Sequence, residues 1–348
     1  MIYCTLFDSN YLDKALVTIE SLFECDSTAK IYVLCMDDRA FEILNDLQIN
    51  NVSLISLKDF EDEDLKKVKE SRSRGEFCWT CTAKLIYYVL SFYKEEICTY
   101  IDADLLFLSD PTILIKEMLD NNCTVQVVRH NFPKNREGRR QEKLSGKICV
   151  EFNTFCNEKR SIDLLKKWIS SCLNECSVDC GGDQMYLNDW DKYDFVNVTK
   201  EKGAGLAPWN IQQFKMVDSN FEQLKDRKSK ERFKPIFYHF QNVTNKDRYT
   251  YSIIPLLSYC KIDKDLIEKI YYPYFRKIEE KKCFFENKYN FLPLIKEYIS
   301  DNRVSKKEYF KRILRHPFSS TPLIFHRIKL SILNKTRYKK AYIDIRNI

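Results

Sequence analysis

The chain has 348 residues, of which 44% are hydrophobic and 14% aromatic. With only seven glycines and nine prolines, it is neither collagen-like nor of low complexity, and disorder cannot dominate it. The net charge of +7 is uneven, because residues 305–348 hold 12 Lys and Arg against Glu308 and Asp344. That segment stands at +10 and the other 304 residues at −3, which excludes a basic body for nucleic acid.

Alternating strand and helix patterns fill the first third of the chain. Residues 2–7, 31–36 and 52–57 are rich in β-branched and aromatic side chains and are predicted to be buried strands. Asn10 is expected to cap a helix between the first two, and Asp38 to begin another after the second. This alternation predicts an α/β fold with a mostly parallel sheet flanked by helices.

The pattern of the remaining chain changes twice. Residues 58–75 are charged throughout and are expected to form an exposed excursion. Helices are then predicted over 80–93, 162–176 and from Pro111 to about Asp120, and strands over 97–101, 123–128, 147–156, 195–198 and 236–240. After about residue 247 only helical patterns remain. We therefore expect an α/β domain over residues 1–250 and a helical, basic C-terminal extension over residues 251–348.

Several features predict a cytoplasmic protein. The N-terminus enters a strand pattern without the features of a signal peptide, and the longest apolar stretch, residues 85–93, is about half of a bilayer span. The sequence leaves open two interpretations of where the basic tail lies. It could lie as an amphipathic helix on the anionic inner face of a membrane, or pack as a solvated helix on the body of the protein.

The 14 cysteines are interpreted mainly as reduced core residues. Cys172, Cys176 and Cys180 recur every four residues, and Cys78 and Cys81 have a C-x-x-C spacing. No histidine accompanies either set at ligand spacing, so structural zinc or redox chemistry is the less favoured alternative.

The Asp-x-Asp pair at residues 102–104 is the strongest chemical signal. Four such pairs occur where about two are expected by chance, so the bare motif means little. Asp102 and Asp104, however, lie between two apolar runs, and burying a carboxylate costs several kcal/mol unless a cation or hydrogen-bond donors compensate. Hard oxygen ligands of this kind suit Mn²⁺ or Mg²⁺. The alternative is a pair of turn or capping aspartates.

The sequence Thr-Tyr-Ile-Asp-Ala-Asp-Leu-Leu-Phe-Leu-Ser-Asp-Pro at residues 99–111 resembles the DxD segment of GT-A glycosyltransferases, in particular family 8 and its bacterial relatives. Further segments are similar to family elements in the same order. These are residues 5–11 (first strand and nucleotide-contacting turn), 83–85 (a basic residue facing the nucleotide-sugar), 182–184 (the Asp-Gln pair) and 237–240 (a late strand supplying a His). The resemblance covers roughly residues 1–245.

The resemblance implies a GT-A-type, Rossmann-like catalytic domain that uses a nucleotide-sugar, with a UDP-sugar as the expected donor. By family pattern the donor and its metal would be contacted by Phe7, Asp8, Asn10, Tyr11, Lys84, Asp102, Ala103 and Asp104. The ion, Mn²⁺ or Mg²⁺, would be held by Asp102, Asp104 and His239, although a lone histidine more often packs in a core. The family's His-x-x-Gly-x-x-Lys-Pro-Trp element is not intact, so its diphosphate lysine has no counterpart here.

Other residues are assigned to catalysis and to the acceptor. The resemblance places Asp183 and Gln184 at the reactive face of the donor sugar and implies retention of anomeric configuration, whereas local sequence alone favours a plain helix cap. Asn153 and Trp209 are candidate acceptor residues, with a core position almost as plausible for Trp209. The arginines at 72 and 74 are possible phosphate contacts, but exposed charges usually have no specific role.

These observations predict a metal-dependent, retaining glycosyltransferase that acts on a glycan or lipid-linked acceptor. Two alternatives stay open. The same aspartate pair would serve a nucleotidyltransferase or phosphoesterase, which would release pyrophosphate or phosphate. A peripheral membrane adaptor would use the basic tail and would not depend on Asp102 or Asp104.

Overall fold

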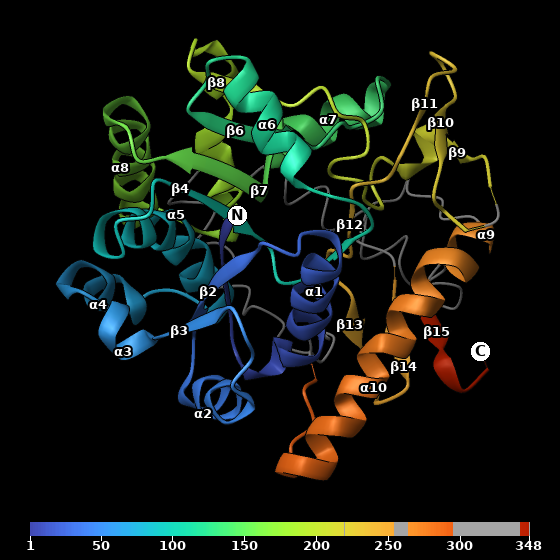
Figure 1. Cartoon of the computed structure of the whole chain (residues 1–348), viewed down its shortest axis with the longest axis horizontal. Helices are drawn as coiled ribbons and strands as arrows, with labels where there is room; N and C mark the ends of the chain where they lie inside the picture. Colours follow the sequence, from blue (N-terminus) through green and yellow to red (C-terminus); the bar gives the residue numbers. More distant parts are fainter. Residues whose placement is uncertain (219, 254–263, 295–341, 348) are drawn as a thin grey trace, which may run out of the picture.

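A seven-stranded sheet runs through the centre of the computed structural model, which describes residues 1–218, 220–253, 264–294 and 342–347 (Figure 1). The strand order is β3-β2-β1-β4-β7-β6-β8. The strands are β1 (Ile2–Phe7), β2 (Lys30–Cys35), β3 (Val52–Ser56), β4 (Ile97–Ile101), β6 (Val125–Arg129), β7 (Ile148–Cys156) and β8 (Val196–Val198). All run in one direction except β7, which is antiparallel to both neighbours. The predicted α/β fold with a mostly parallel sheet is confirmed.

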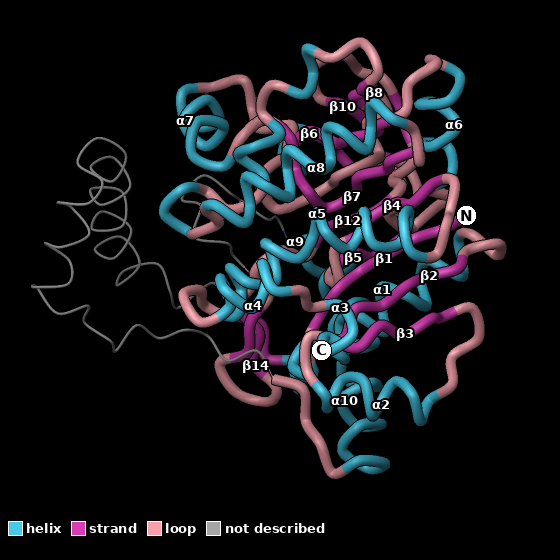
Figure 2. Tube along the Cα trace, turned by 90° about the vertical axis from the view of Figure 1, so that its left-hand side faces the viewer, coloured by secondary structure: helices cyan, strands magenta, loops and turns pink. Residues whose placement is uncertain are grey.

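Helices cover both faces of this sheet, whose strands lie side by side in Figure 2. The helices of this part of the chain are α1 (Leu12–Cys25), α2 (Asp38–Leu47), α3 (Leu57–Phe60), α4 (Glu63–Lys69), α5 (Arg74–Phe92), α6 (Thr112–Asp120), α7 (Arg136–Ser145) and α8 (Lys159–Asn174), of which α7 lies beyond the edge of the sheet (Figure 2). Cys4 and Leu6 of β1 face a core shared with α5 and α8. Tyr3 and Phe7 face the opposite core, shared with α1 and α2, as the alternation of side chains along a strand requires.

Local capping explains where the structure departs from the predicted elements. Residues 58–75 are not a bare excursion, because Ser56 and Asp62 cap the short helices α3 and α4. Asn10 caps no helix; its backbone N–H instead donates to the side chain of Asp8, at the start of a 3₁₀ turn. The helix α7 was not predicted, and Asn135 caps its N-terminus.

Smaller sheets lie beside the central one. A two-stranded sheet joins β5 (Leu105–Phe107) to β12 (Phe237–His239), which are antiparallel. Two three-stranded sheets are formed by β9 (Phe214–Met216), β10 (Leu224–Asp226) and β11 (Arg232–Phe233), and by β13 (Thr244–Asn245), β14 (Thr250–Ser252) and β15 (Tyr342–Asp344). The β5–β12 pair matters most for function, because it continues directly from the aspartate pair.

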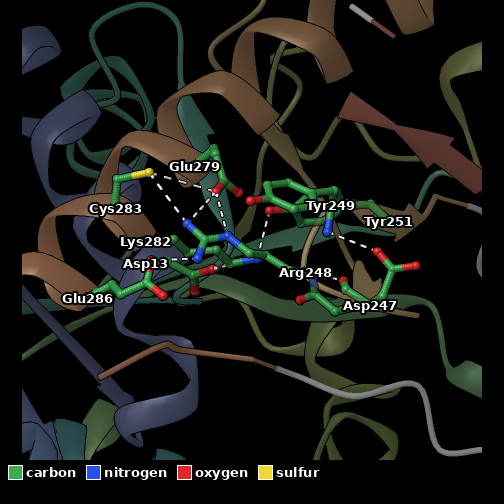
Figure 3. Close-up of polar contacts among 10 residues, drawn as sticks. Asp13, Asp247, Arg248, Tyr249, Tyr251, Glu279, Lys282, Cys283 and Glu286 are labelled. Carbon is green, nitrogen blue, oxygen red and sulfur yellow. Dashed lines mark hydrogen bonds and ion pairs between the residues drawn. The ribbon is translucent and has the colours of Figure 1, made fainter. Parts of the chain in front are cut away.

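The described part of the C-terminal extension packs on the N-terminal helix. It contains α9 (Lys264–Leu266), a π-helical turn (Ile267–Tyr271) and α10 (Tyr272–Tyr289), and α10 lies along α1 (Figure 1). The expectation of helices alone after residue 247 is wrong, because β14 pairs with β15 in this part of the chain. Lys282 of α10 reaches Asp13 of α1 at 3.7 Å, and its Nζ donates to the hydroxyl of Tyr251 at 2.7 Å (Figure 3). The domain division at residue 250 stays a prediction. Residues 295–341, which hold most of the basic tail, lie outside the described residues.

Two expectations concern cysteines and membranes. The cysteines in the described part of the chain are free thiols, and most of them are buried. Among the residues that the structure describes, none of the helices has the length and apolar character needed to cross a bilayer.

Candidate active site

The two aspartates and the histidine predicted as metal ligands meet in the structure. Asp102 and Asp104 lie in the turn between β4 and β5, and the pairing of β5 with β12 places His239 opposite Leu105. As a result, Nε2 of His239 lies 3.2 Å from Oδ1 of Asp104 and 3.7 Å from Oδ2 of Asp102. Three potential ligand atoms, one from each residue, lie within 4.8 Å of one another.

Glu151 of β7 orients this histidine. Its Oε2 lies 2.5 Å from Nδ1 of His239, and its side chain is fully buried. An ionised carboxylate only accepts hydrogen bonds, so Nδ1 is the donor and Nε2 is the nitrogen that faces the aspartates. The backbone N–H of Asp102 also donates to the carbonyl of Glu151, at 3.1 Å. Sequence analysis missed Glu151, although an acidic residue inside an otherwise apolar strand was the available signal.

The site has more buried negative charge than its histidine can balance. Burial raises the pKa of Asp102 to about 6, against the opposing effect of His239 and with reinforcement from Asp104 and Glu151. Burial by itself lowers the pKa of His239, but Asp104 and the other acidic neighbours raise it well above its usual value. Within the described residues, no Lys or Arg pairs with Asp102 or Asp104. The donor set and its charge therefore fit a divalent cation.

A second group of possible ligands shares the histidine. One potential ligand atom from each of Cys149, Glu151 and His239 also lies within 4.8 Å of the others. Burial raises the pKa of the Cys149 thiol well above its usual value, so binding a metal as a thiolate would first have to offset that cost. The two aspartates with His239 are the better metal site.

The glycine-containing loop at residues 203–210 packs against His239 and Glu151. Trp209 is 2% exposed, its ring meets that of His239 edge-on at 5.4 Å, and its Nε1 donates to the carbonyl of His130 at 2.7 Å. Gly205 has φ +67°, and a Cβ there would lie 2.5 Å from Oε1 of Glu151. In this structure Trp209 packs on the site rather than presenting an open face, and its acceptor role stays a prediction.

The turn after β1 approaches the aspartates from another side. Oδ1 of Asp8 accepts a hydrogen bond from the backbone N–H of Asn10 at 2.8 Å, and Arg74 pairs with both Asp8 and Asp37. Burial, followed by the charges of Asp104 and Asp8, raises the pKa of Tyr11. Phe7, just before the turn, is buried in the core.

Two predicted cationic contacts point elsewhere. Lys84 pairs with Asp62 at the N-terminus of α4 and makes no ion pair with Asp102 or Asp104. Arg72 donates to the carbonyls of Cys172 and Leu173 at 2.6 and 2.7 Å, which satisfies the C-terminal end of α8. Neither cation is therefore free for a phosphate in this arrangement.

Asp183 does not behave as a plain helix cap. It occupies the N-cap position of a 3₁₀ turn but makes no capping hydrogen bond, and its Oδ2 is buried without a partner among the described residues. Burial and then the charges of Cys176 and Asp102 raise its pKa well above the usual range, so the carboxyl lies near the aspartate pair. Burial lowers the pKa of His130 to about 3, and Gln184 is among the neighbours that oppose this shift. Asn153 of β7 is fully buried, and its Oδ1 has no partner in the described part of the chain.

Two curated proteins of Bacillus subtilis (strain 168) are similar in sequence. YfnD is 28% identical over 281 residues, which are 78% of this chain and 86% of YfnD. YfnF is 32% identical over 251 residues, which are 68% of this chain and 80% of YfnF. Both are described as uncharacterized proteins. No family model matches the chain.

Solved structures with a similar fold include three glycosyltransferases. Galactosyltransferase LgtC with donor and acceptor sugar analogues is 13% identical, with a TM-score of 0.49 over 80% of this chain and 96% of that one. GlyE of Streptococcus pneumoniae TIGR4 is 14% identical, with a TM-score of 0.46 over 80% and 62%. Mouse xyloside xylosyltransferase 1 is 11% identical, with a TM-score of 0.42 over 60% and 87%. At this distance, these structures assign neither activity nor residue roles to the chain.

Proposed function

The chain belongs to the same family as the Bacillus subtilis protein YfnF, and we propose that it is a metal-dependent glycosyltransferase that uses a nucleotide-sugar. The expected donor is a UDP-sugar and the expected acceptor a glycan or lipid-linked sugar. This proposal rests on the residues of the site and on the resemblance of the DxD segment at residues 99–111 to GT-A enzymes.

The observation that carries the proposal is the convergence of Asp102, Asp104 and His239. Nε2 of the histidine lies 3.2 Å from Asp104 and 3.7 Å from Asp102, at the end of a central strand. Ligands of open α/β sheets bind at the carboxyl ends of strands. Two hard carboxylate oxygens and one imidazole suit Mn²⁺ or Mg²⁺, and the excess buried negative charge supplies a reason for a cation to bind there.

The chain's own residues have distinct roles in this proposal. A bound divalent cation would neutralise the charge that develops on the leaving nucleoside diphosphate. Asp102 and Asp104 would hold the cation, and the contact of Glu151 with Nδ1 leaves Nε2 of His239 available as a third ligand. The turn that contains Asp8 and Asn10 would contact the nucleotide, and the charges of Asp104 and Asp8 both act on the buried hydroxyl of Tyr11.

The side that faces the reacting sugar is formed by Asp183 and Gln184. Asp183 presents a buried carboxyl oxygen without a partner among the described residues. A buried oxygen without a hydrogen bond costs free energy, and a hydroxyl group of the donor sugar would remove this cost by forming that bond. Its position near Asp102 fits contact with the donor sugar. We infer retention of anomeric configuration from the family resemblance of this Asp-Gln pair.

A panel of nucleotide-sugars incubated with Mn²⁺ and the full chain tests the proposal. We expect one donor to yield free nucleoside diphosphate, with loss of that activity in the Asp102→Asn variant and no change in Asp64→Asn, an exposed carboxylate in another Asp-x-Asp pair. Release of pyrophosphate or inorganic phosphate would instead indicate a nucleotidyltransferase or phosphoesterase. No turnover and no metal-dependent nucleotide binding with any donor would reject the proposal.

A further inference from the structure

A basic pocket of about 500 Å³ lies between α7 and the end of β6. Four of the side chains that line it are cationic, namely Arg129, Lys134, Arg139 and Lys147, and one is acidic, Glu142. Phe132 supplies an aromatic wall. These cations come from the end of β6, the loop after it, α7 and the residue before β7, so they are not one solvated face of a single helix.

The positive charge of this pocket is only partly balanced. Arg129 pairs with Asp191 at 2.7 Å, and Lys147 lies 3.9 Å from the same carboxylate. Lys134 and Arg139 make no ion pair within the described part of the chain, and both are exposed. Glu142 is the single carboxylate in the lining, so the pocket retains a net positive charge that an anion would neutralise.

Ring contacts connect this pocket to the candidate metal site. Phe132 stacks on His130 with centroids 4.9 Å apart, and His130 meets Trp209 edge-on at 5.5 Å. Trp209 in turn contacts the ring of His239 at 5.4 Å. Phe132 and Trp209 also face each other at 6.4 Å, so two ring contacts separate the pocket wall from the proposed metal ligand.

The pocket also adjoins the turn that contains Asp183 and Gln184. The backbone N–H of Lys147 donates to Oδ1 of Asn188 at 2.8 Å. The carbonyl of Leu144 in α7 lies 3.2 Å from the position that a Cβ on Gly181 would occupy. The end of α7 and the Asp-Gln turn therefore form one packed unit, on the side of the site assigned to the reacting sugar rather than to the nucleotide.

We propose that this pocket binds a phosphate group carried by the acceptor. The inference rests on the proposed glycosyltransferase function and specifies that the acceptor of this enzyme is anionic. The guanidinium groups of Arg129 and Arg139 can hold phosphate oxygens in pairs, and Lys134 adds a flexible charge. Two sources share this chemistry, a sugar linked to lipid through diphosphate and a glycan that carries phosphate esters.

Calorimetric titrations of the full chain, without metal or nucleotide, test this inference. The probes are glucose 1-phosphate and methyl glucoside, which share the sugar but differ in charge. We expect the phosphate ester to bind and the glycoside not to bind. The double variant Lys134→Ala/Arg139→Ala should weaken binding at least about tenfold, because it removes both unpaired cations. The control Arg136→Ala/Lys143→Ala removes two exposed cations of α7 that do not line the pocket, and it should leave binding unchanged.

Further measurements distinguish a failure of this inference from a failure of the proposed function. Saturating UDP with Mn²⁺ should not displace glucose 1-phosphate, and the double variant should bind UDP with unchanged affinity. Displacement by UDP, or binding of neither sugar by the wild type, overturns the inference, while the donor panel still decides the proposed function on its own. A short prenyl diphosphate sugar that binds more tightly than glucose 1-phosphate assigns the lipid-linked source, and the reverse order assigns the phosphorylated glycan.

Discussion

Oε2 of Glu151 lies 2.5 Å from Nδ1 of His239, a contact between residues 88 positions apart in the chain. It joins the central strand β7 to the outer strand β12 and leaves Nε2 of the imidazole facing Asp102 and Asp104. A carboxylate behind a metal-binding histidine fixes the ring and strengthens it as a ligand. The geometry of the proposed metal site therefore depends on a residue that touches no metal.

The variant Glu151→Gln tests this dependence. The amide is similar in size but carries no charge, so we expect affinity for Mn²⁺ to fall roughly 10- to 100-fold. Electron paramagnetic resonance of free Mn²⁺ measures the affinity directly. Glu158→Gln, at an exposed position just after β7, serves as the control and should bind like the wild type. Equal affinity in all three proteins would show that His239 does not need its carboxylate partner.

Metal should also stabilise the fold in a way that one substitution removes. Asp102, Asp104 and Glu151 surround a single imidazole, so the folded protein should bind a cation that the unfolded chain does not. A ligand that binds only the folded state stabilises it, by about 2.7 kcal/mol when Mn²⁺ is at 100 times its dissociation constant. We expect Asp104→Asn to lose this stabilisation and, in the absence of metal, to unfold at nearly the same temperature, since it removes both the repulsion of Asp102 and the attraction of His239. Scanning calorimetry with and without Mn²⁺ measures both effects.

The Asp64→Asn variant controls for the loss of a carboxylate. Asp64 is exposed in α4 and pairs with Lys67 on the surface, so its removal should leave the metal-induced shift intact. An unchanged shift in Asp104→Asn, or a lost shift in Asp64→Asn, would contradict the assignment of the ion to the buried pair.

Local pattern in the sequence predicted the parallel sheet, whereas the meeting of Asp102, Asp104 and His239 was implied by the family resemblance of the segments that contain them. Strands β1, β3 and β4 alternate with amphipathic helices, and the aspartates directly follow a buried strand. The charged residues 58–75 misled the prediction, since charge composition does not reveal the caps that Ser56 and Asp62 provide for two short helices.

Contacts that depend on tertiary packing were harder to predict. Lys84 pairs with Asp62, which no local pattern indicates, and its expected contact with the nucleotide-sugar stays a prediction. Glu151 was overlooked because a single acidic residue in a strand has no spacing relationship to a histidine 88 positions later. The helix α7 has a polar composition without an apolar stripe, so periodicity could not reveal it.

The glycine that precedes Asp183 should be sensitive to a single methyl group. Gly182 has φ +73°, and a Cβ there would lie 3.3 Å from the ring of Trp79. We expect Gly182→Ala to lower stability by about 1–2 kcal/mol and to reduce kcat further than the affinity for the donor, because the strain displaces the Asp183 carboxyl.

Gly75 provides the matched control for this substitution. It lies in the first turn of α5, with nothing within 4 Å of an added Cβ. Gly75→Ala should therefore be neutral or slightly stabilising, since alanine favours the helix. Urea unfolding and initial rates of donor turnover measure the two variants side by side. Equal behaviour of both would show that the backbone at Gly182 imposes no constraint on the site.

The buried lysine that joins α10 to α1 should make stability depend on pH in the alkaline range. Nζ of Lys282 lies 3.7 Å from Oδ2 of Asp13 and donates to the hydroxyl of Tyr251 (Figure 3). Burial lowers its pKa from 10.5 to about 8, although Asp13 opposes this shift. Between these two values the unfolded chain binds the proton and the folded chain does not, so this group makes stability rise with pH.

The comparison with Lys282→Met isolates this effect, because all other titrating groups are common to both proteins. We expect the free energy of unfolding of the wild type, relative to the variant, to increase by on the order of 3 kcal/mol as pH rises from 8 to 10.5. Urea unfolding at intervals across this range measures it. A difference that stays constant with pH would mean that Lys282 keeps its proton in the folded state, held by Asp13 as a buried ion pair. In that case α10 would be tied to α1 by charge, and substitution of Asp13 would then cost several kcal/mol.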